Sequence, residues 1–109
     1  MLENFRYSLP IEVRFADLDV LGHLNNATYL TYAEQVRIVY VRDVCGWDGG
    51  AWSTLGMILA RTEIDYKLPI AFEHSVIAYV RISRIGGKSF DMDYVITRQT
   101  GDNDPEIAA

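Results

Sequence analysis

Five polar residues that could do chemistry crowd a short stretch between residues 17 and 26. They are two aspartates, one histidine and two asparagines, namely Asp17, Asp19, His23, Asn25 and Asn26. An alternating apolar pattern precedes this stretch and a helical pattern follows it, so it is predicted to be a turn that opens a helix. The first N–H groups of a helix lack intrahelical partners and can polarise a carbonyl group or an anion. With Asp19 and His23 as titratable groups, the turn has the composition of an acyl-transfer site.

A structural interpretation of the same stretch is the alternative. Aspartate and asparagine are common turn and helix-capping residues, and His23 can be an ordinary polar turn residue. Taken singly, each residue is more often structural than catalytic. Their joint order favours a functional site.

The order of residues from Asp17 to Tyr29, Asp-Leu-Asp-Val-Leu-Gly-His-Leu-Asn-Asn-Ala-Thr-Tyr, resembles the signature of the hotdog-fold acyl thioesterases. It is similar to the 4-hydroxybenzoyl-CoA thioesterase family and its acyl-CoA and acyl-ACP relatives. The resemblance implies hydrolysis of a thioester to a carboxylic acid and a free thiol. Asp19 matches the family's catalytic carboxylate, which acts as nucleophile or as general base, and Asp17 then supports the turn or lies on its opposite face.

Two further residues receive roles from the resemblance. His23 matches the histidine of the plant acyl-ACP thioesterase motif, although Leu21 stands where that motif has an asparagine. His23 is therefore expected to orient groups, to handle a proton, or to serve the turn only. Asn26 aligns with a histidine of bacterial acyl-CoA thioesterases associated with the cell envelope. Its N–H, at the helix start, is the expected donor to the thioester oxygen.

A second candidate site is the segment around Gly86-Gly87, a dipeptide that predicts a tight two-residue hairpin. Its position resembles the family's coenzyme A-contacting strands. Arg84, Lys88 and Ser89 would bind the anionic carrier, and Gly86 and Gly87 would let the backbone approach it. Solvated charge beside a hairpin explains the same residues about equally well.

The acyl group would lie against apolar side chains near the helix start. Tyr29 is the proposed substrate-binding residue there, with Leu30, Met57 and Tyr66 beside it. This lining would accept an aliphatic or an aryl acyl group, and it leaves the chain length and the choice between coenzyme A and acyl carrier protein open.

The elements that must position these residues follow from periodicity. Apolar residues at three- and four-residue steps predict a helix over 27–44, with Asn25 or Asn26 as its cap and Gly46 at its end. Its apolar stripe is predicted to be formed by Leu30, Ala33, Val36 or Arg37, Tyr40, Val41 and Val44. Alternation predicts strands over 10–15, 57–68, 76–85 and 88–99. The three glycines of residues 46–53 predict a loop, and residues 100–109 are turn-like.

One helix and four strands make an α+β domain, in which an antiparallel sheet covers a single helix. The resemblance names this arrangement the hotdog fold. Residues 1–109 are expected to form one domain. Members of the fold usually carry another strand after the one that ends near residue 99, so a C-terminal strand is expected to be missing and the sequence to be a truncated stretch.

Composition excludes several classes of protein. The 109 residues are 50% hydrophobic and carry a formal charge of −5, which argues against a nucleic-acid partner. No stretch is apolar enough to span a membrane, and a cytoplasmic location is expected. One cysteine and two distant histidines offer no metal spacing, so neither a metal nor a cofactor is expected beyond the coenzyme A thioester as substrate.

The resemblance also bears on the oligomeric state of the protein and on whether it is an enzyme. The small sheet and the shared sites of the family imply a homodimer or homotetramer. A non-catalytic acyl-CoA-binding hotdog module is the alternative to the enzyme, whereas the signature of the hotdog dehydratases is not evident.

Overall fold

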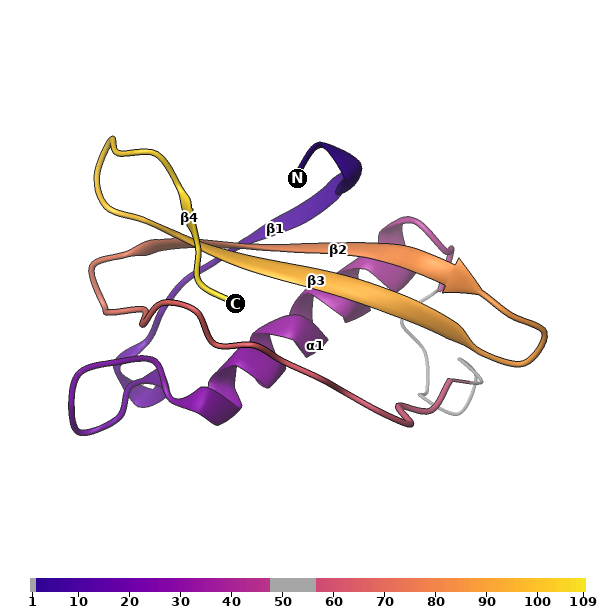
Figure 1. Cartoon of the computed structure of the whole chain (residues 1–109), viewed down its shortest axis with the longest axis horizontal. Helices are drawn as coiled ribbons and strands as arrows, with labels where there is room; N and C mark the ends of the chain where they lie inside the picture. Colours follow the sequence, from indigo (N-terminus) through magenta and orange to yellow (C-terminus); the bar gives the residue numbers. More distant parts are fainter. Residues whose placement is uncertain (1, 48–56) are drawn as a thin grey trace.

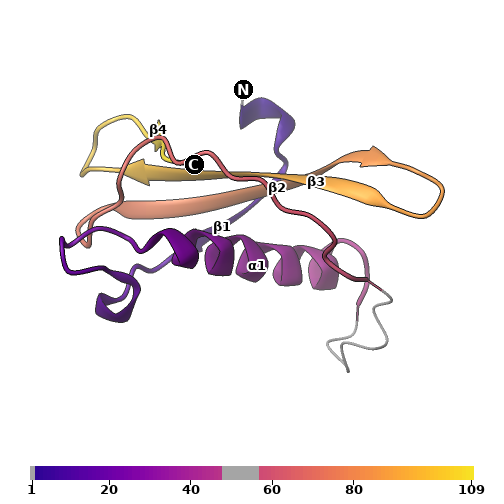
Figure 2. The same ribbon diagram turned by 60° about the horizontal axis from the view of Figure 1, so that its bottom comes forward.

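The computed structural model of the 109-residue chain describes residues 2–47 and 57–109. In this part of the chain, one long helix lies against one face of a four-stranded antiparallel sheet (Figures 1 and 2). The elements, in chain order, are η1 (Leu2–Asn4), β1 (Tyr7–Ile11), η2 (Phe15–Asp17), α1 (Asn26–Asp43), β2 (Ser75–Ile85), β3 (Phe90–Gln99) and β4 (Glu106–Ile107), where η marks a short 3-10 helix. The predicted α+β class, with one helix packed on an antiparallel sheet, is confirmed.

The sheet has the order β1-β2-β3-β4, and each strand is antiparallel to its neighbour. Alternate residues of β2 are buried against the helix layer, namely Val76, Ala78 and Val80. This period of two is the predicted pattern of a strand with one wet face. The predicted strands 76–85 and 88–99 correspond to β2 and β3, which form the longest pairing of the sheet.

Helix α1 agrees with its predicted range to within one residue at each end. The side chain of Asn25 accepts a hydrogen bond of 2.9 Å from the N–H of Ala27, so Asn25 is the cap. Gly46 follows the helix end with a φ of 80°, a conformation that glycine adopts without a steric penalty. Both ends are therefore set by the residues that the sequence indicated.

The buried face of α1 differs in part from the predicted stripe. The buried side chains of the helix are Tyr29, Tyr32, Val36 and Val41, and the first three belong to the core that the helix shares with the sheet. Leu30 and Val44, which periodicity placed on the apolar face, are 42% and 56% exposed. The face that α1 turns to the sheet is the one that carries Tyr29 and Tyr32, because their rings are large and apolar although their hydroxyl groups are polar.

The predicted strand over 10–15 is wrong in position. Strand β1 ends at Ile11, and Phe15 begins η2 with its side chain 77% exposed. The Phe15 ring stacks on the ring of Phe72, with 4.3 Å between centroids and 3° between planes. An ion pair of 3.0 Å between Arg14 and Asp17 closes the chain locally, which ends the extended conformation before Phe15.

The predicted strand over 57–68 is also wrong. The segment forms no described strand, and its backbone bonds to the sheet region only where the N–H groups of Lys67 and Leu68 donate to the Ala108 carbonyl, at 2.8 and 3.2 Å. Ile58 and Leu59 are 92% and 65% exposed. Periodicity can predict an extended backbone, but a strand needs a partner, and the nearest strand, β4, is two residues long.

Two turns also differ from their predictions. The segment expected to be turn-like contains β4, which pairs with β3 at Thr97↔Ile107 and Arg98↔Glu106, so a short fourth strand stands where none was expected. The predicted tight hairpin is present but shifted by one residue: the last strand pair is Ile85↔Phe90, and a 2.7 Å bond from the Gly86 N–H to the Ser89 carbonyl makes Gly87 and Lys88, rather than Gly86 and Gly87, the two central residues of the turn. The predicted loop over 46–53 lies outside the described residues, apart from its first two.

Candidate functional site

The polar turn before α1 is a small antiparallel ribbon. At its base the N–H of Asn25 donates to the carbonyl of Asp17 at 2.9 Å, and at its far end the N–H of Asp19 donates to the carbonyl of His23 at 2.7 Å. Gly22, with a φ of 79°, closes the tip by donating to the carbonyl of Asp19 at 3.0 Å. Residues 17–25 are called the ribbon below. Its geometry explains how so polar a segment keeps one shape.

The Asp19 side chain is exposed at the far end of the ribbon. One carboxylate oxygen, Oδ1, accepts hydrogen bonds from the N–H groups of Leu21 at 2.9 Å and His23 at 3.1 Å. Within residues 2–47 and 57–109, no group bonds to the second oxygen. The turn thus fixes the orientation of the carboxylate and leaves one oxygen for other chemistry.

His23 lies at the far end of the ribbon, whereas Asn26 directly follows the ribbon's last residue. The His23 side chain is exposed, and its backbone forms an isolated bridge with Ala71. Asn26 is the first residue of α1, and no acceptor for its N–H is found in the described part of the chain. Asp19 and His23 therefore lie together at the far end of the ribbon, and Asn26 lies just after its base.

Asp17 is the buried carboxylate of the ribbon. Its side chain is 5% exposed and accepts hydrogen bonds from the Arg14 N–H at 3.0 Å, the Arg14 guanidinium at 3.0 Å and the Tyr32 hydroxyl at 2.8 Å. Burial raises the pKa of Asp17, but these hydrogen bonds outweigh it and hold the pKa below its ordinary value. Burial, together with the neighbouring Asp17 carboxylate, raises the pKa of Tyr32. Asp17 is thus ionised, satisfied and supportive of the turn.

Tyr29 lies in the core rather than on an open surface. It is 2% exposed, its ring meets the ring of Tyr66 edge-on at 5.1 Å, and its hydroxyl donates to the Leu68 carbonyl at 3.4 Å. The Tyr66 hydroxyl in turn donates to the carbonyl of Asn26 at 2.9 Å. Of the predicted apolar lining, Tyr66 and Leu30 are surface residues beside the start of α1, whereas Tyr29 supports them from beneath.

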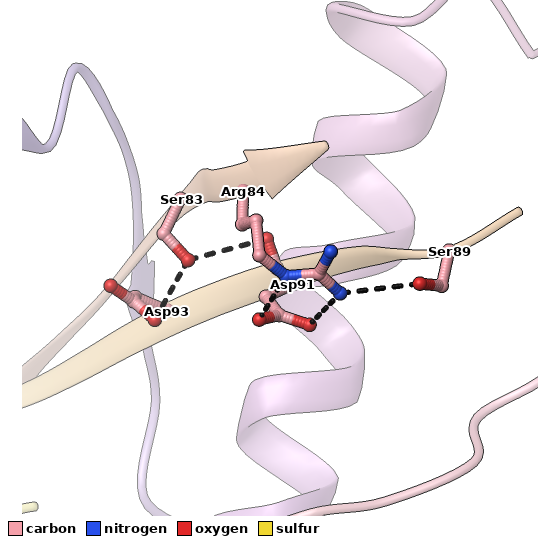
Figure 3. A network of polar contacts seen from close by, with 5 residues as sticks. All are labelled: Ser83, Arg84, Ser89, Asp91 and Asp93. Atoms are coloured by element: carbon pink, nitrogen blue, oxygen red, sulfur yellow. Dashed lines mark hydrogen bonds and ion pairs between the residues drawn. The ribbon is translucent and has the colours of Figure 1, made fainter. Parts of the chain in front are cut away.

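The second candidate site lies on the hairpin between β2 and β3. Arg84 there forms two hydrogen bonds with Asp91, at 2.9 and 3.1 Å, and a third with the Ser89 hydroxyl at 3.2 Å (Figure 3). The guanidinium holds the pKa of the Asp91 carboxyl below its ordinary value. The Ser83 hydroxyl extends this network, since it lies within hydrogen-bond distance of the Asp91 backbone carbonyl and of the Asp93 carboxylate. Arg84 and Ser89 therefore belong to a surface network in which Asp91 already neutralises the charge of Arg84.

The two hairpin glycines have different surroundings. A Cβ added at Gly86 would lie 2.8 Å from the Arg84 guanidinium, so that backbone is covered. A Cβ added at Gly87 would meet no atom within 4 Å, and Lys88 beside it is exposed. Gly87 and Lys88 are therefore the open part of this predicted binding segment.

Within one chain, the structure does not bring the two candidate sites together. Figure 1 shows the β2–β3 hairpin at one end of the molecule and the ribbon before α1 at the other. A ligand that touched Asp19 and Lys88 of the same chain would have to follow the whole length of the helix.

Sequence reasoning missed the role of Tyr32 and understated that of Asp17. The available signal was a tyrosine on the inward face of the helix, since a buried hydroxyl needs a hydrogen-bond partner.

Among the described residues, no three side chains of His, Cys, Asp or Glu gather as a metal site. No helix in that part of the chain is long and apolar enough to cross a membrane.

Comparisons with known proteins give this geometry a context. A thioesterase of Thermus thermophilus, solved with coenzyme A and Zn, is 36% identical and superposes with a TM-score of 0.81, over 97% of this chain and 74% of that one. A putative acyl-CoA thioesterase of Xanthomonas campestris is 28% identical with a TM-score of 0.75, over 87% and 79% of the two chains. These likenesses confirm the hotdog fold.

Relatives of known sequence agree. The long-chain acyl-CoA thioesterase FadM of Escherichia coli K12 is 29% identical over 80% of this chain, and the uncharacterized protein YsmA of Bacillus subtilis 168 is 27% identical over 84% of it. The chain spans only 66% of FadM and 61% of YsmA. The profile of the thioesterase-like superfamily matches residues 13–109, and the chain therefore belongs to the thioesterase-like superfamily.

Proposed function

We propose that this chain hydrolyses acyl thioesters of coenzyme A or acyl carrier protein, with Asp19 as nucleophile or general base. The observation that carries the proposal is the Asp19 carboxylate itself. Two backbone N–H groups hold one of its oxygens, and in the described part of the chain no group bonds to the other oxygen. Thioester hydrolysis needs a positioned carboxylate and a donor to the carbonyl oxygen, and the Asn26 N–H, which has no acceptor in the described part of the chain, is the candidate donor.

The proposed chemistry assigns one step to each group. The free Asp19 oxygen attacks the thioester carbonyl carbon, or removes a proton from a water molecule that attacks it. The N–H of Asn26 donates to the carbonyl oxygen as negative charge develops there. Collapse of the intermediate breaks the carbon–sulfur bond, and the thiolate leaves with a proton, which His23 is placed on the same ribbon to handle. On the nucleophile route this leaves an acyl–Asp19 anhydride, which a water molecule then hydrolyses to restore the carboxylate. On either route the products are a carboxylic acid and a free thiol.

Similarity to named proteins supports the substrate class. FadM is a long-chain acyl-CoA thioesterase, and the Thermus protein was solved with coenzyme A. We infer that this chain also takes a coenzyme A thioester and needs no cofactor besides this substrate. The acyl group would lie against Tyr66 and Leu30, which are 44% and 42% exposed near the helix start.

The carrier end of the substrate leads to a proposal about assembly. The β2–β3 hairpin, which carries Lys88, and the ribbon, which carries Asp19, lie at opposite ends of one chain (Figure 1), so we infer that a substrate bound by both takes its contacts from two chains. We propose a homodimer or homotetramer in which the hairpin of one subunit reaches the ribbon of another. The exposed Ile58 and Leu59 are apolar surface that such an interface would cover.

One experiment separates the enzyme from a non-catalytic acyl-CoA-binding module. Purified protein is incubated with acetyl-, octanoyl-, palmitoyl- and benzoyl-CoA and with the matching acyl carrier protein thioesters, and free thiol is measured. A thioesterase releases thiol from at least one of them with turnover. A binder shows saturable affinity by calorimetry and no thiol release above the uncatalysed rate, an outcome that would replace the present proposal.

A further inference from the structure

The buried end of the ribbon is built differently from its exposed end. At the exposed end Asp19 is held by backbone groups alone. At the buried end both the side chain and the carbonyl of Asp17 are bonded, the carbonyl to the Asn25 N–H at 2.9 Å. Because Asp17 precedes Asp19 by two residues, any shift of Asp17 moves the exposed carboxylate with it.

The three donors to the Asp17 side chain come from two different parts of the fold, the preceding turn and helix α1. Two of them belong to Arg14, three residues earlier, whose side chain is 69% exposed and lies on the same local turn. The third is the hydroxyl of Tyr32, 2.8 Å away on a ring that is 3% exposed and packed in the core. Within the described residues, this is the one side-chain hydrogen bond that joins η2 to α1.

We propose that Asp17 and Tyr32 are positioning residues that hold the Asp19 carboxylate in place relative to the first turn of α1. The proposal rests on the proposed function, because it assigns the hydrogen bond a purpose in thioester hydrolysis. Its physical basis is the sensitivity of catalysis to geometry, since a displacement of about 1 Å can cost roughly 100-fold in rate. A core tyrosine fixes the buried end of the ribbon more firmly than a surface arginine, whose side chain is free to reorient.

The test is Tyr32→Phe, which removes the hydroxyl and keeps the ring in the core. Asp17 keeps both Arg14 donors, so the fold survives. The expected result is a kcat lower by about 10- to 100-fold with KM within about twofold, because the substrate contacts are unchanged while the reacting groups are misaligned. A wild-type kcat in Tyr32→Phe would overturn the proposal.

The matched control is Val36→Ala, one turn further along α1. Val36 is fully buried, and the smaller side chain weakens the core without changing any hydrogen bond of the ribbon. At a temperature where both variants are folded, Val36→Ala should keep the wild-type kcat. Equal losses in the two variants would show that Tyr32 acts only through general stability, and the assignment would be withdrawn.

Backbone hydrogen exchange gives a readout that does not depend on activity. The N–H groups of Asp19, His23 and Asn25 all donate within the ribbon. In Tyr32→Phe these amides should exchange at least tenfold faster than in Val36→Ala. A wild-type protein that hydrolyses no thioester would contradict the proposed function, whereas unchanged exchange in Tyr32→Phe would overturn the anchoring role, whatever the activity.

Discussion

Replacement of Asp19 by asparagine is the most direct test of the proposed mechanism. The carboxamide oxygen of Asp19→Asn can still accept from the N–H groups of Leu21 and His23, so the ribbon should keep its shape. The second oxygen becomes an NH₂ group, which can neither attack a carbonyl nor take a proton. A positioned acid–base group contributes about 10²- to 10⁴-fold, so kcat should fall by roughly that factor, or about 2.7–5.4 kcal/mol of activation free energy.

The stability of the same variant separates catalysis from a turn role. Two charge-assisted hydrogen bonds become neutral ones at an exposed site, and the free energy of unfolding should fall by about 1 kcal/mol or less. Steady-state thiol release and thermal melts measure the two effects. Asp102→Asn, in the exposed turn between β3 and β4, removes an equal charge and should change neither. An Asp19→Asn protein that melts earlier but turns over normally would refute the catalytic assignment.

Three other predictions concern charge, carrier binding and assembly. Because the pKa of Asp17 is lowered by folding, its ionised form stabilises the fold fully above the unfolded pKa near 4, and this stabilisation is lost as the pH falls through the folded pKa. In thermal melts from pH 7 to pH 2, the Tm of the wild type should therefore fall more steeply than the Tm of Asp17→Asn. Parallel curves for the two proteins would contradict this prediction. Lys88→Ala combined with Arg84→Ala should raise KM for acyl-CoA severalfold, leave kcat nearly unchanged and spare short pantetheine thioesters, whereas equal effects on both substrates would show a structural role. Light scattering should show a dimer or tetramer, and a fully active monomer would exclude the shared site.

The parts of the fold that depend on local sequence were predictable. Helix α1 carries its own cap at Asn25 and its own terminator at Gly46, and the first half of β2, up to Val80, alternates between buried and less buried residues, so these elements follow from residues close together in the chain. Residues 57–68 have a strand-like sequence but no strand beside most of them to complete a ladder. Pairing is a property of two segments, and one segment's periodicity does not contain it.

In the candidate site, too, the local groupings were predictable from the sequence and the long-range contacts were not. Asp19, His23 and Asn26 are near one another in the chain, and the sequence motif was sufficient to group them. The hydrogen bond between Asp17 and Tyr32 joins residues 15 positions apart, and it depends on which face of α1 is turned towards the core. The predicted stripe placed Leu30 on the buried face, but Leu30 is exposed, so this orientation was not predicted correctly. The pairing of Arg84 with Asp91 likewise depends on the strand register, which shifts between Ile82 and Arg84.

The way in which Asp19 is held has a consequence for engineering. The two groups that fix its carboxylate are the backbone N–H groups of Leu21 and His23, and every amino acid except proline supplies such a group. Val20 and Leu21 are 100% and 76% exposed, so their side chains are not needed for the turn. Positions 20 and 21 can therefore be randomised to search for new acyl-group preferences while the carboxylate keeps its place, provided that proline is left out of the library at position 21.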